Sequence, residues 1–235
     1  MLIHDLPVPI NGVIFDFHST LVHGGDPGRW IEAAFDHLAD AGSPPPELSA
    51  ADIEGLREYL SDIWRHAHTI DPKSERDLSH ARHQDVFART VALYPGVKPD
   101  LIGALYAVMI DRWEAYDDTL PVVRELKSRG VKVAVLSNVG MDIRPCLDRS
   151  GLTELLDAVV LSYEVGLVKP DPAVFAHALE LLDVPGRRTL MVGDSPRDDV
   201  GGAVLGIRTL ILPHTDGPVH GLGAVPRLVG HDARG

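Results

Sequence analysis

The sequence lacks several features that mark specialised classes of protein. It has one cysteine, Cys146, so no disulfide can form within the chain, which is typical of a reducing compartment. The longest apolar run, residues 101–110, is about half the roughly 20 residues that a membrane helix needs, so we expect a buried helix there. The first ten residues lack a basic start followed by an apolar stretch, which argues against a signal peptide. Together these absences predict a cytoplasmic protein without a membrane segment.

Basic residues are also few. The chain has 22 Lys plus Arg against 34 Asp plus Glu, a net charge of −12 with neutral histidines. Phosphate backbones and anionic membrane surfaces repel so acidic a chain, so we expect neither as a partner. Most of the excess lies in residues 22–118, which hold 18 acidic and 9 basic residues. This distribution favours small substrates over polyanions, and it leaves the oligomeric state open.

Short apolar segments and helical segments alternate in the second half of the chain. Strands are expected over five segments, at 12–17, 131–136, 158–161, 189–192 and 209–212. Helices are expected between them, at 121–128, 143–150, 173–182 and 199–205. This alternation predicts an α/β fold with a doubly wound, Rossmann-like parallel sheet and right-handed crossovers. The tail from residue 213 onward is expected to be loop, with a candidate edge strand near 225–229.

The stretch between the first strand and the rest of the α/β pattern has a different period. From about residue 29 to 118 the apolar residues recur at helical spacing, and prolines divide the stretch into what we interpret as four helices. We therefore predict an α/β core formed by residues 1–21 and 119–235, interrupted by a helical cap at 22–118.

Polar side chains follow four of the predicted strands, at the sheet edge where open α/β folds bind ligands. In chain order these are Asp16 with His18 and Thr20, then Ser137 with Asn138, then Lys169, and finally Asp194, Asp198 and Asp199. A carboxylate such as Asp16 can act as a nucleophile toward phosphorus or a halogenated carbon. Lys169 can offset the charge of a phosphate, and Ser137 and Asn138 can donate hydrogen bonds to it. Mg²⁺ prefers oxygen ligands, which Asp16 and Asp194 could supply.

Four motifs in this order resemble the haloacid dehalogenase-like hydrolases: DFHSTL at 16–21, VLSN at 135–138, VKPDP at 168–172 and VGDSPRDDVGGA at 192–203. The resemblance implies a nucleophilic Asp16 that forms an aspartyl-phosphate, with Thr20 supporting its loop. It also implies that Ser137 and Lys169 bind the phosphate. For the Mg²⁺ cofactor it implies Asp16, Asp194 and the backbone carbonyl of His18 as ligands. Asp199, or as second choice Asp198, would be the supporting carboxylate.

The first motif departs from the family's phosphatases at one position. Most of them carry an Asp two residues after the nucleophile, as general acid and base, where this chain has His18. An imidazole titrates near neutral pH, so our hypothesis is that His18 takes over this role, held partly protonated by Asp16 and Asp194. The alternatives are a slow phosphatase, a metal-independent 2-haloacid dehalogenase, or a non-catalytic member that binds phosphate or protein. The acids after the fourth strand favour a metal-dependent hydrolase of a small phosphate ester.

Charged residues of the predicted cap need an interpretation as well. His80 and His83 have a spacing that could place two imidazoles on one metal ion, but the sequence offers no third ligand at a fixed spacing. We therefore interpret them as solvated or substrate-facing. The acids of 71–77 we interpret as a solvated face and a helix start. We expect three cap arginines, Arg57, Arg65 and Arg82, to pair with nearby acids at the surface.

Overall fold

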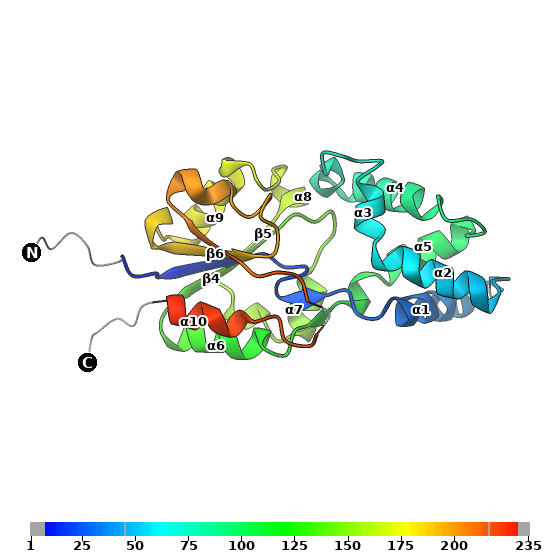
Figure 1. Ribbon diagram of the computed structural model, residues 1–235, viewed down its shortest axis with the longest axis horizontal. Helices are drawn as coiled ribbons and strands as arrows, with labels where there is room; N and C mark the ends of the chain where they lie inside the picture. The colour runs from blue at the N-terminus through cyan, green and yellow to red at the C-terminus, as the bar shows by residue number, and fades with distance from the viewer. Residues whose placement is uncertain (1–7, 45, 216, 230–235) are drawn as a thin grey trace, which may run out of the picture. The chain divides into compact units, whose positions relative to one another are not determined.

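The computed structural model describes residues 8–44, 46–215 and 217–229 (Figure 1). The chain divides into two compact units. Unit 1 consists of Met1–His23, Ala115–Asn138 and Leu147–Gly235, and unit 2 of Gly24–Glu114 and Val139–Cys146. The two ends of the predicted core, 1–7 and 230–235, lie outside the described residues. No helix among the described residues is long and apolar enough to cross a membrane.

Unit 1 contains a five-stranded sheet in the order β5-β4-β1-β6-β7. Its strands are β1 (Gly12–Phe15), β4 (Lys132–Ser137), β5 (Ala158–Leu161), β6 (Thr189–Gly193) and β7 (Arg208–Ile211). Every neighbouring pair is parallel. This arrangement confirms the predicted Rossmann-like fold, and it puts the carboxyl ends of β4, β1 and β6 side by side.

The sheet is buried because its strands are apolar on both faces. Val13, Ile14 and Phe15 of β1 are fully buried. Figure 1 shows α9 (Pro172–Leu182) on one side of the sheet, and α6 (Thr119–Ser128) with α10 (Val225–Leu228) on the other. The apolar face of α9 joins Ile14 in a single core cluster. Continuous apolar strands with helices on both sides are typical of parallel sheets.

Two elements of unit 1 differ from the prediction. Residues 225–228 form the helix α10 rather than an edge strand. Leu222, Val225 and Val229 are buried at helical spacing, and Pro226 lies in the first turn, where its missing N–H is not needed. The predicted helix at 199–205 is a 3₁₀ helix, η6 (Gly201–Leu205). A Cβ on Gly201 would lie 2.0 Å from the carbonyl oxygen of Pro170, so this segment packs too closely for most side chains.

Unit 2 is helical. Its α-helices are α1 (Pro27–Asp40), α2 (Ala50–Ser61), α3 (Ile63–Ala67), α4 (His80–Val91) and α5 (Pro99–Ala107). The prediction of four helices is wrong by one, because the chain leaves helical geometry at Asp62 (φ −114°, ψ 20°), between α2 and α3. Trp30 of α1 donates a hydrogen bond to the Leu105 carbonyl (2.8 Å) and ties α1 to α5. Unit 2 also includes Val139–Cys146, which the sequence-based boundaries assign to the core.

Candidate active site

Asp16 lies directly after β1, in a tightly turned loop. The backbone N–H groups of Leu21 and Val22 both donate to the Phe17 carbonyl, at 2.8 and 3.1 Å, and Ser19 takes a left-handed conformation (φ 66°). This turn brings the buried Thr20 back over the strand end. Its Oγ1 donates to Oδ2 of Asp16 at 3.1 Å. The loop therefore orients a carboxylate that is itself only 7% exposed.

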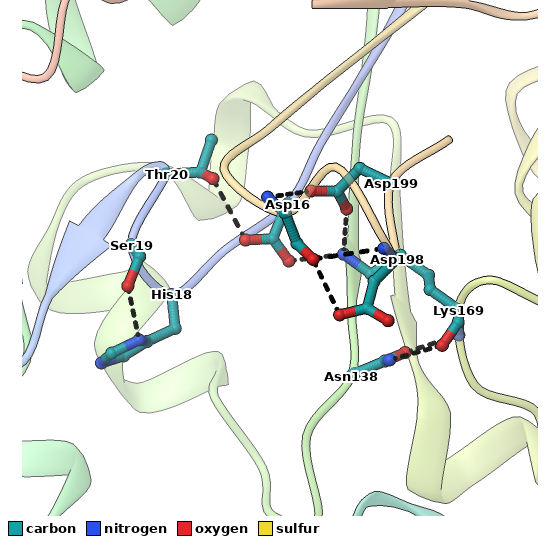
Figure 2. A network of polar contacts seen from close by, with 9 residues as sticks. Asp16, His18, Ser19, Thr20, Asn138, Lys169, Asp198 and Asp199 are labelled. Carbon is teal, nitrogen blue, oxygen red and sulfur yellow. Dashed lines mark hydrogen bonds and ion pairs between the residues drawn. The ribbon is translucent and has the colours of Figure 1, made fainter. Parts of the chain in front are cut away.

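Lys169 joins two carboxylates from different strand ends (Figure 2). Its Nζ donates to Oδ1 of Asp16 at 2.6 Å and to Oδ1 of Asp199 at 2.7 Å. Burial by itself lowers the pKa of Lys169, but the charges and hydrogen bonds of the two carboxylates outweigh it and raise the pKa. Lys169 is therefore an ammonium ion at neutral pH, directly beside the Asp16 carboxylate.

Asn138 fixes the backbone of Lys169 from the end of β4. Its Nδ2 donates to the Lys169 carbonyl at 2.9 Å, and its Oδ1 accepts from the Lys169 N–H at 2.7 Å. These two bonds span 31 positions of sequence, and no sequence pattern indicated them. Asn138 thus positions Lys169, and its contact with phosphate stays a prediction. Ser137, the last residue of β4, is 3% exposed.

The structure distinguishes the two acids that the sequence left as alternatives. Asp199 is fully buried; its Oδ1 accepts from Lys169, and its Oδ2 accepts from the Ser195 backbone N–H at 3.0 Å. Asp198 instead accepts from the Ser195 hydroxyl at 2.9 Å. A Cβ on Gly193 would lie 2.0 Å from Oδ2 of Asp199, so the buried carboxylate occupies space that the glycine leaves free. Asp199 belongs to the network around Lys169, and Asp198 belongs to the loop beside it.

Asp194 carries negative charge that its surroundings do not fully compensate. Burial, followed by the charges of Asp16 and Asp199, raises the pKa of the Asp194 carboxyl to about 7, although Lys169 opposes the shift. Lys169 thus bonds two carboxylates, and Asp194 adds a third negative charge close by. Such a site favours the arrival of a further cation.

His18 is half-buried, and its environment differs from the one we predicted. Figure 2 shows its ring beside Ser19, with Nδ1 lying 3.1 Å from the Ser19 hydroxyl oxygen. Burial, followed by the neighbouring imidazoles of His214 and His23, lowers the pKa of His18 to about 4. The expectation that Asp16 and Asp194 hold it partly protonated is therefore wrong. Desolvation and nearby imidazoles dominate here, and His18 is neutral at pH 7.

The donor set suits Mg²⁺ by its chemistry. Among the described residues, no three His, Cys, Asp or Glu side chains are placed so that they could hold one metal ion. Mg²⁺, however, usually takes only one or two protein carboxylates and fills its other positions with water, carbonyl groups and substrate. Asp16 and Asp194 can provide the two carboxylates, and the raised pKa of Asp194 shows the negative charge that a divalent cation would offset.

Some predictions for the charged residues of the cap agree with the structure and others do not. Arg57, Arg65 and Arg82 form surface ion pairs with nearby acids, as predicted. Asp71 and Asp77 are buried rather than solvated. The segment does start a helix, because Asp71 accepts from the backbone N–H groups of Glu75 and Arg76 in the 3₁₀ helix Glu75–Leu78. His83 is also buried rather than solvated, at 3% exposed. Spacing along a helix predicts which residues share a face, but it does not show whether that face is covered.

Comparison with known proteins assigns the chain to a family. A protein-family model described as "haloacid dehalogenase-like hydrolase" matches residues 10–206. The pyrophosphatase PpaX of Bacillus cereus is 39% identical over 212 residues, which cover 88% of this chain and 84% of that protein. A glyceraldehyde 3-phosphate phosphatase of Methanothermobacter thermautotrophicus is 28% identical over 214 residues, covering 88% and 87% of the two chains.

Solved structures with this fold include enzymes of two kinds. A phosphatase of the same family from Thermococcus onnurineus matches with a TM-score of 0.63 and 20% identity, over 96% of this chain and all of that one. A 2-haloacid dehalogenase from Pseudomonas syringae matches with a TM-score of 0.60 and 23% identity, over 93% and 97% of the two chains. At these identities the likeness concerns the fold alone. With the family match covering most of its length, the chain belongs to the haloacid dehalogenase-like hydrolases.

Proposed function

We propose that this protein hydrolyses a small phosphate ester, with Asp16 as the nucleophile and Mg²⁺ as the cofactor. One observation carries the proposal: Asp16, at the end of the central strand, is held through one oxygen by Lys169 and through the other by Thr20. Both bonds orient the carboxylate for nucleophilic attack. The two curated relatives described above are a phosphatase and a pyrophosphatase by name, which agrees with this chemistry.

The reaction has two steps. A carboxylate oxygen of Asp16 attacks the phosphorus atom, the bond from phosphorus to the ester oxygen breaks, and the leaving alcohol takes up a proton. Water then attacks the phosphorus of the aspartyl-phosphate, which releases phosphate and regenerates the carboxylate of Asp16. Separating hydrolysis into two displacements is the advantage of a covalent intermediate.

The surrounding residues offset negative charge during both steps. In the proposal the ammonium of Lys169 and the hydroxyl of Ser137 bind the phosphate oxygens, while Asp199 and Asn138 hold Lys169 in place. Mg²⁺ would be held by Asp16, Asp194 and the backbone carbonyl of His18. When bound, it offsets the charge of the carboxylates and of the phosphate, which otherwise repel each other.

His18 is the proposed acid/base. Its neutral imidazole can accept a proton from the attacking water in the second step. Donating a proton to the leaving group requires the protonated form, which a bound phosphate would favour by its negative charge. General acid/base help is worth about 10²–10⁴-fold. We therefore expect His18→Ala to lose about 10²-fold in kcat and His18→Asp to retain activity, whereas full activity of His18→Ala would refute the role of His18.

The substrate is expected to be a small phosphorylated molecule, with residues 22–118 acting as a cap. The two relatives compared above are named for different phosphate compounds, so their names do not indicate one substrate for this chain. A panel of metabolite phosphates, assayed with Mg²⁺ and with EDTA, would identify it. We expect activity that requires Mg²⁺ and disappears in Asp16→Asn.

A dehalogenase is the second candidate, favoured by the missing Asp at position 18. It would release halide from a 2-haloacid without metal, which can be measured by adding 2-haloacids to the same panel. Phosphate release that depends on Asp16 supports the proposal, whereas halide release in EDTA would replace it. Binding of phosphate with no turnover of either substrate class would instead indicate a non-catalytic member.

A further inference from the structure

Two histidines of unit 2 contact the chain just beyond the phosphate-binding strand end. His80 and His83 lie on α4, and Gly140 lies two residues after Asn138. The Gly140 carbonyl oxygen lies 3.2 Å from Nδ1 of His80, and since a carbonyl only accepts, the imidazole must donate. A Cβ on Gly140 would lie 2.3 Å from the Cβ of His83, closer than side-chain atoms can approach. His80 thus hydrogen-bonds to the backbone of Gly140, and His83 limits how closely that backbone can approach α4.

The helix start explains why these two rings are well placed. Ser79 caps α4 by accepting from the Arg82 N–H at 3.3 Å, which fixes the first turn that contains His80. His83 follows on the same face. Its Nδ1 lies 3.0 Å from the Tyr106 hydroxyl, and its ring packs 5.0 Å from that of Trp64. His83 is therefore a fixed surface, against which Gly140 rests without a side chain.

We infer that His80 and His83 are positioning residues that set the backbone after Asn138 and thereby aid phosphate binding. The inference rests on the proposed function. From Gly140 the chain leads back through Val139 to Asn138, which holds both backbone polar groups of Lys169, and to Ser137. Displacing the segment would move the groups that are proposed to bind phosphate.

An ordinary packing role predicts a different result. His80 is exposed, so its ring adds little to the core, and its imidazole hydrogen-bonds to the Gly140 carbonyl. If α4 simply covered the segment, removing the His80 ring would not alter the affinity for phosphate. Positioning predicts weaker binding with little change in stability.

The test compares His80→Ala, His80→Asn and the control His68→Ala, which removes another exposed histidine of unit 2. For His80→Ala we expect KM and the inhibition constant of inorganic phosphate to rise about 3- to 10-fold, the equivalent of one hydrogen bond. We expect kcat to change less than about twofold and the melting temperature to stay near that of the wild type. His80→Asn, whose amide N–H can replace the donor, should restore most of the affinity, and His68→Ala should behave as the wild type.

A second variant tests the contact with His83. Gly140→Ala introduces the excluded Cβ and should displace the segment. Since a displacement of about 1 Å near a reacting centre can cost on the order of 100-fold, we expect a fall in kcat/KM of up to that size.

Unchanged phosphate affinity in His80→Ala would overturn the inference, as would a loss of affinity accompanied by a matching fall in melting temperature. If the wild type neither hydrolyses phosphate esters nor is inhibited by phosphate, the proposed function fails first and the inference falls with it.

Discussion

Each unit of this protein holds a cation between two carboxylates, yet the two clusters differ in charge balance. In unit 1, Lys169 lies 2.6 and 2.7 Å from Asp16 and Asp199. In unit 2, Arg76 lies 3.5 and 3.6 Å from Asp71 and Asp77.

The neighbours of the two cations reveal the difference. The cluster of unit 1 adds a third carboxylate, Asp194, whose pKa is raised to about 7 by burial and by the other acids. The cluster of unit 2 adds an aromatic ring, Trp64, with Arg76 5.2 Å from its centre, and a buried His83 whose pKa is lowered to about 3. The cluster of unit 2 therefore carries one excess negative charge, whereas the cluster of unit 1 carries two when Asp194 is ionised. The larger excess in unit 1 would favour a bound cation.

The largest difference between the two clusters should appear when the cation of each is removed. Lys169→Met takes away the charge beside the nucleophile, so we expect kcat/KM to fall by on the order of 10²–10³-fold or more. Arg76→Met should leave kcat/KM within about twofold, while both variants lose stability because buried carboxylates are left without their partner. Steady-state kinetics and urea unfolding measure the two effects. Comparable activity losses in the two variants would show that the clusters do not differ in role.

Acid should weaken the protein through His83. Burial, followed by the charges of Arg76 and His80, lowers the pKa of His83 to about 3, below its value of 6.5 in the unfolded chain. The unfolded state therefore binds the proton first, and stability is lost as the pH falls from about 6.5 toward 3. By pH 5 the free energy of unfolding has fallen by about 2 kcal/mol because of His83.

The matched variant is His83→Asn, which cannot titrate but keeps a polar group toward Tyr106. Urea unfolding at pH 7 and pH 5 should show a smaller acid loss for this variant than for the wild type. His18 and His220, whose pKa values are also lowered chiefly by burial, contribute equally to both proteins. Equal acid losses in the two proteins would exclude His83 as a source.

Asp194→Asn should sharpen the contrast in charge. The pKa of Asp194 is about 7 in the folded protein and about 4 in the unfolded chain, so the unfolded chain loses this proton first. The free energy of unfolding therefore falls as the pH rises from about 4 to about 7. At pH 8 without divalent cations this shift of about three pKa units corresponds to about 4 kcal/mol, so we expect the variant to be clearly more stable than the wild type. Mg²⁺ should stabilise the wild type but not the variant. Thermal unfolding with and without Mg²⁺ tests this, with Asp198→Asn as the control that gains nothing.

The smallest effect should come from a surface pair of unit 2. Arg82 lies 3.2 Å from Glu75, and both side chains are more than half exposed. Solvent screens such pairs, so Arg82→Ala should change the free energy of unfolding by at most about 0.5 kcal/mol. A loss comparable to that of Arg76→Met would mean that exposure does not separate the two arginines.

Much of the site could be predicted because of how parallel sheets are built. Adjacent parallel strands end at one edge, so residues that follow β1, β4 and β6 meet even though they are far apart in sequence. That rule was enough to select Asp16, Ser137 and Asp194. The role of Asn138 in holding the backbone of Lys169 was not predictable, because it depends on the path of a loop rather than on strand order.

The sequence by itself determined the alternation of strands and helices, the order of the four motifs and the acids available at the strand ends, since these depend on local residue patterns. Only the tertiary structure decided that Asp199 rather than Asp198 bonds Lys169, that His18 is neutral, and that His83 is buried. Charge interactions and desolvation depend on distances of a few ångströms and on the depth of burial, and neither is encoded in spacing along the chain.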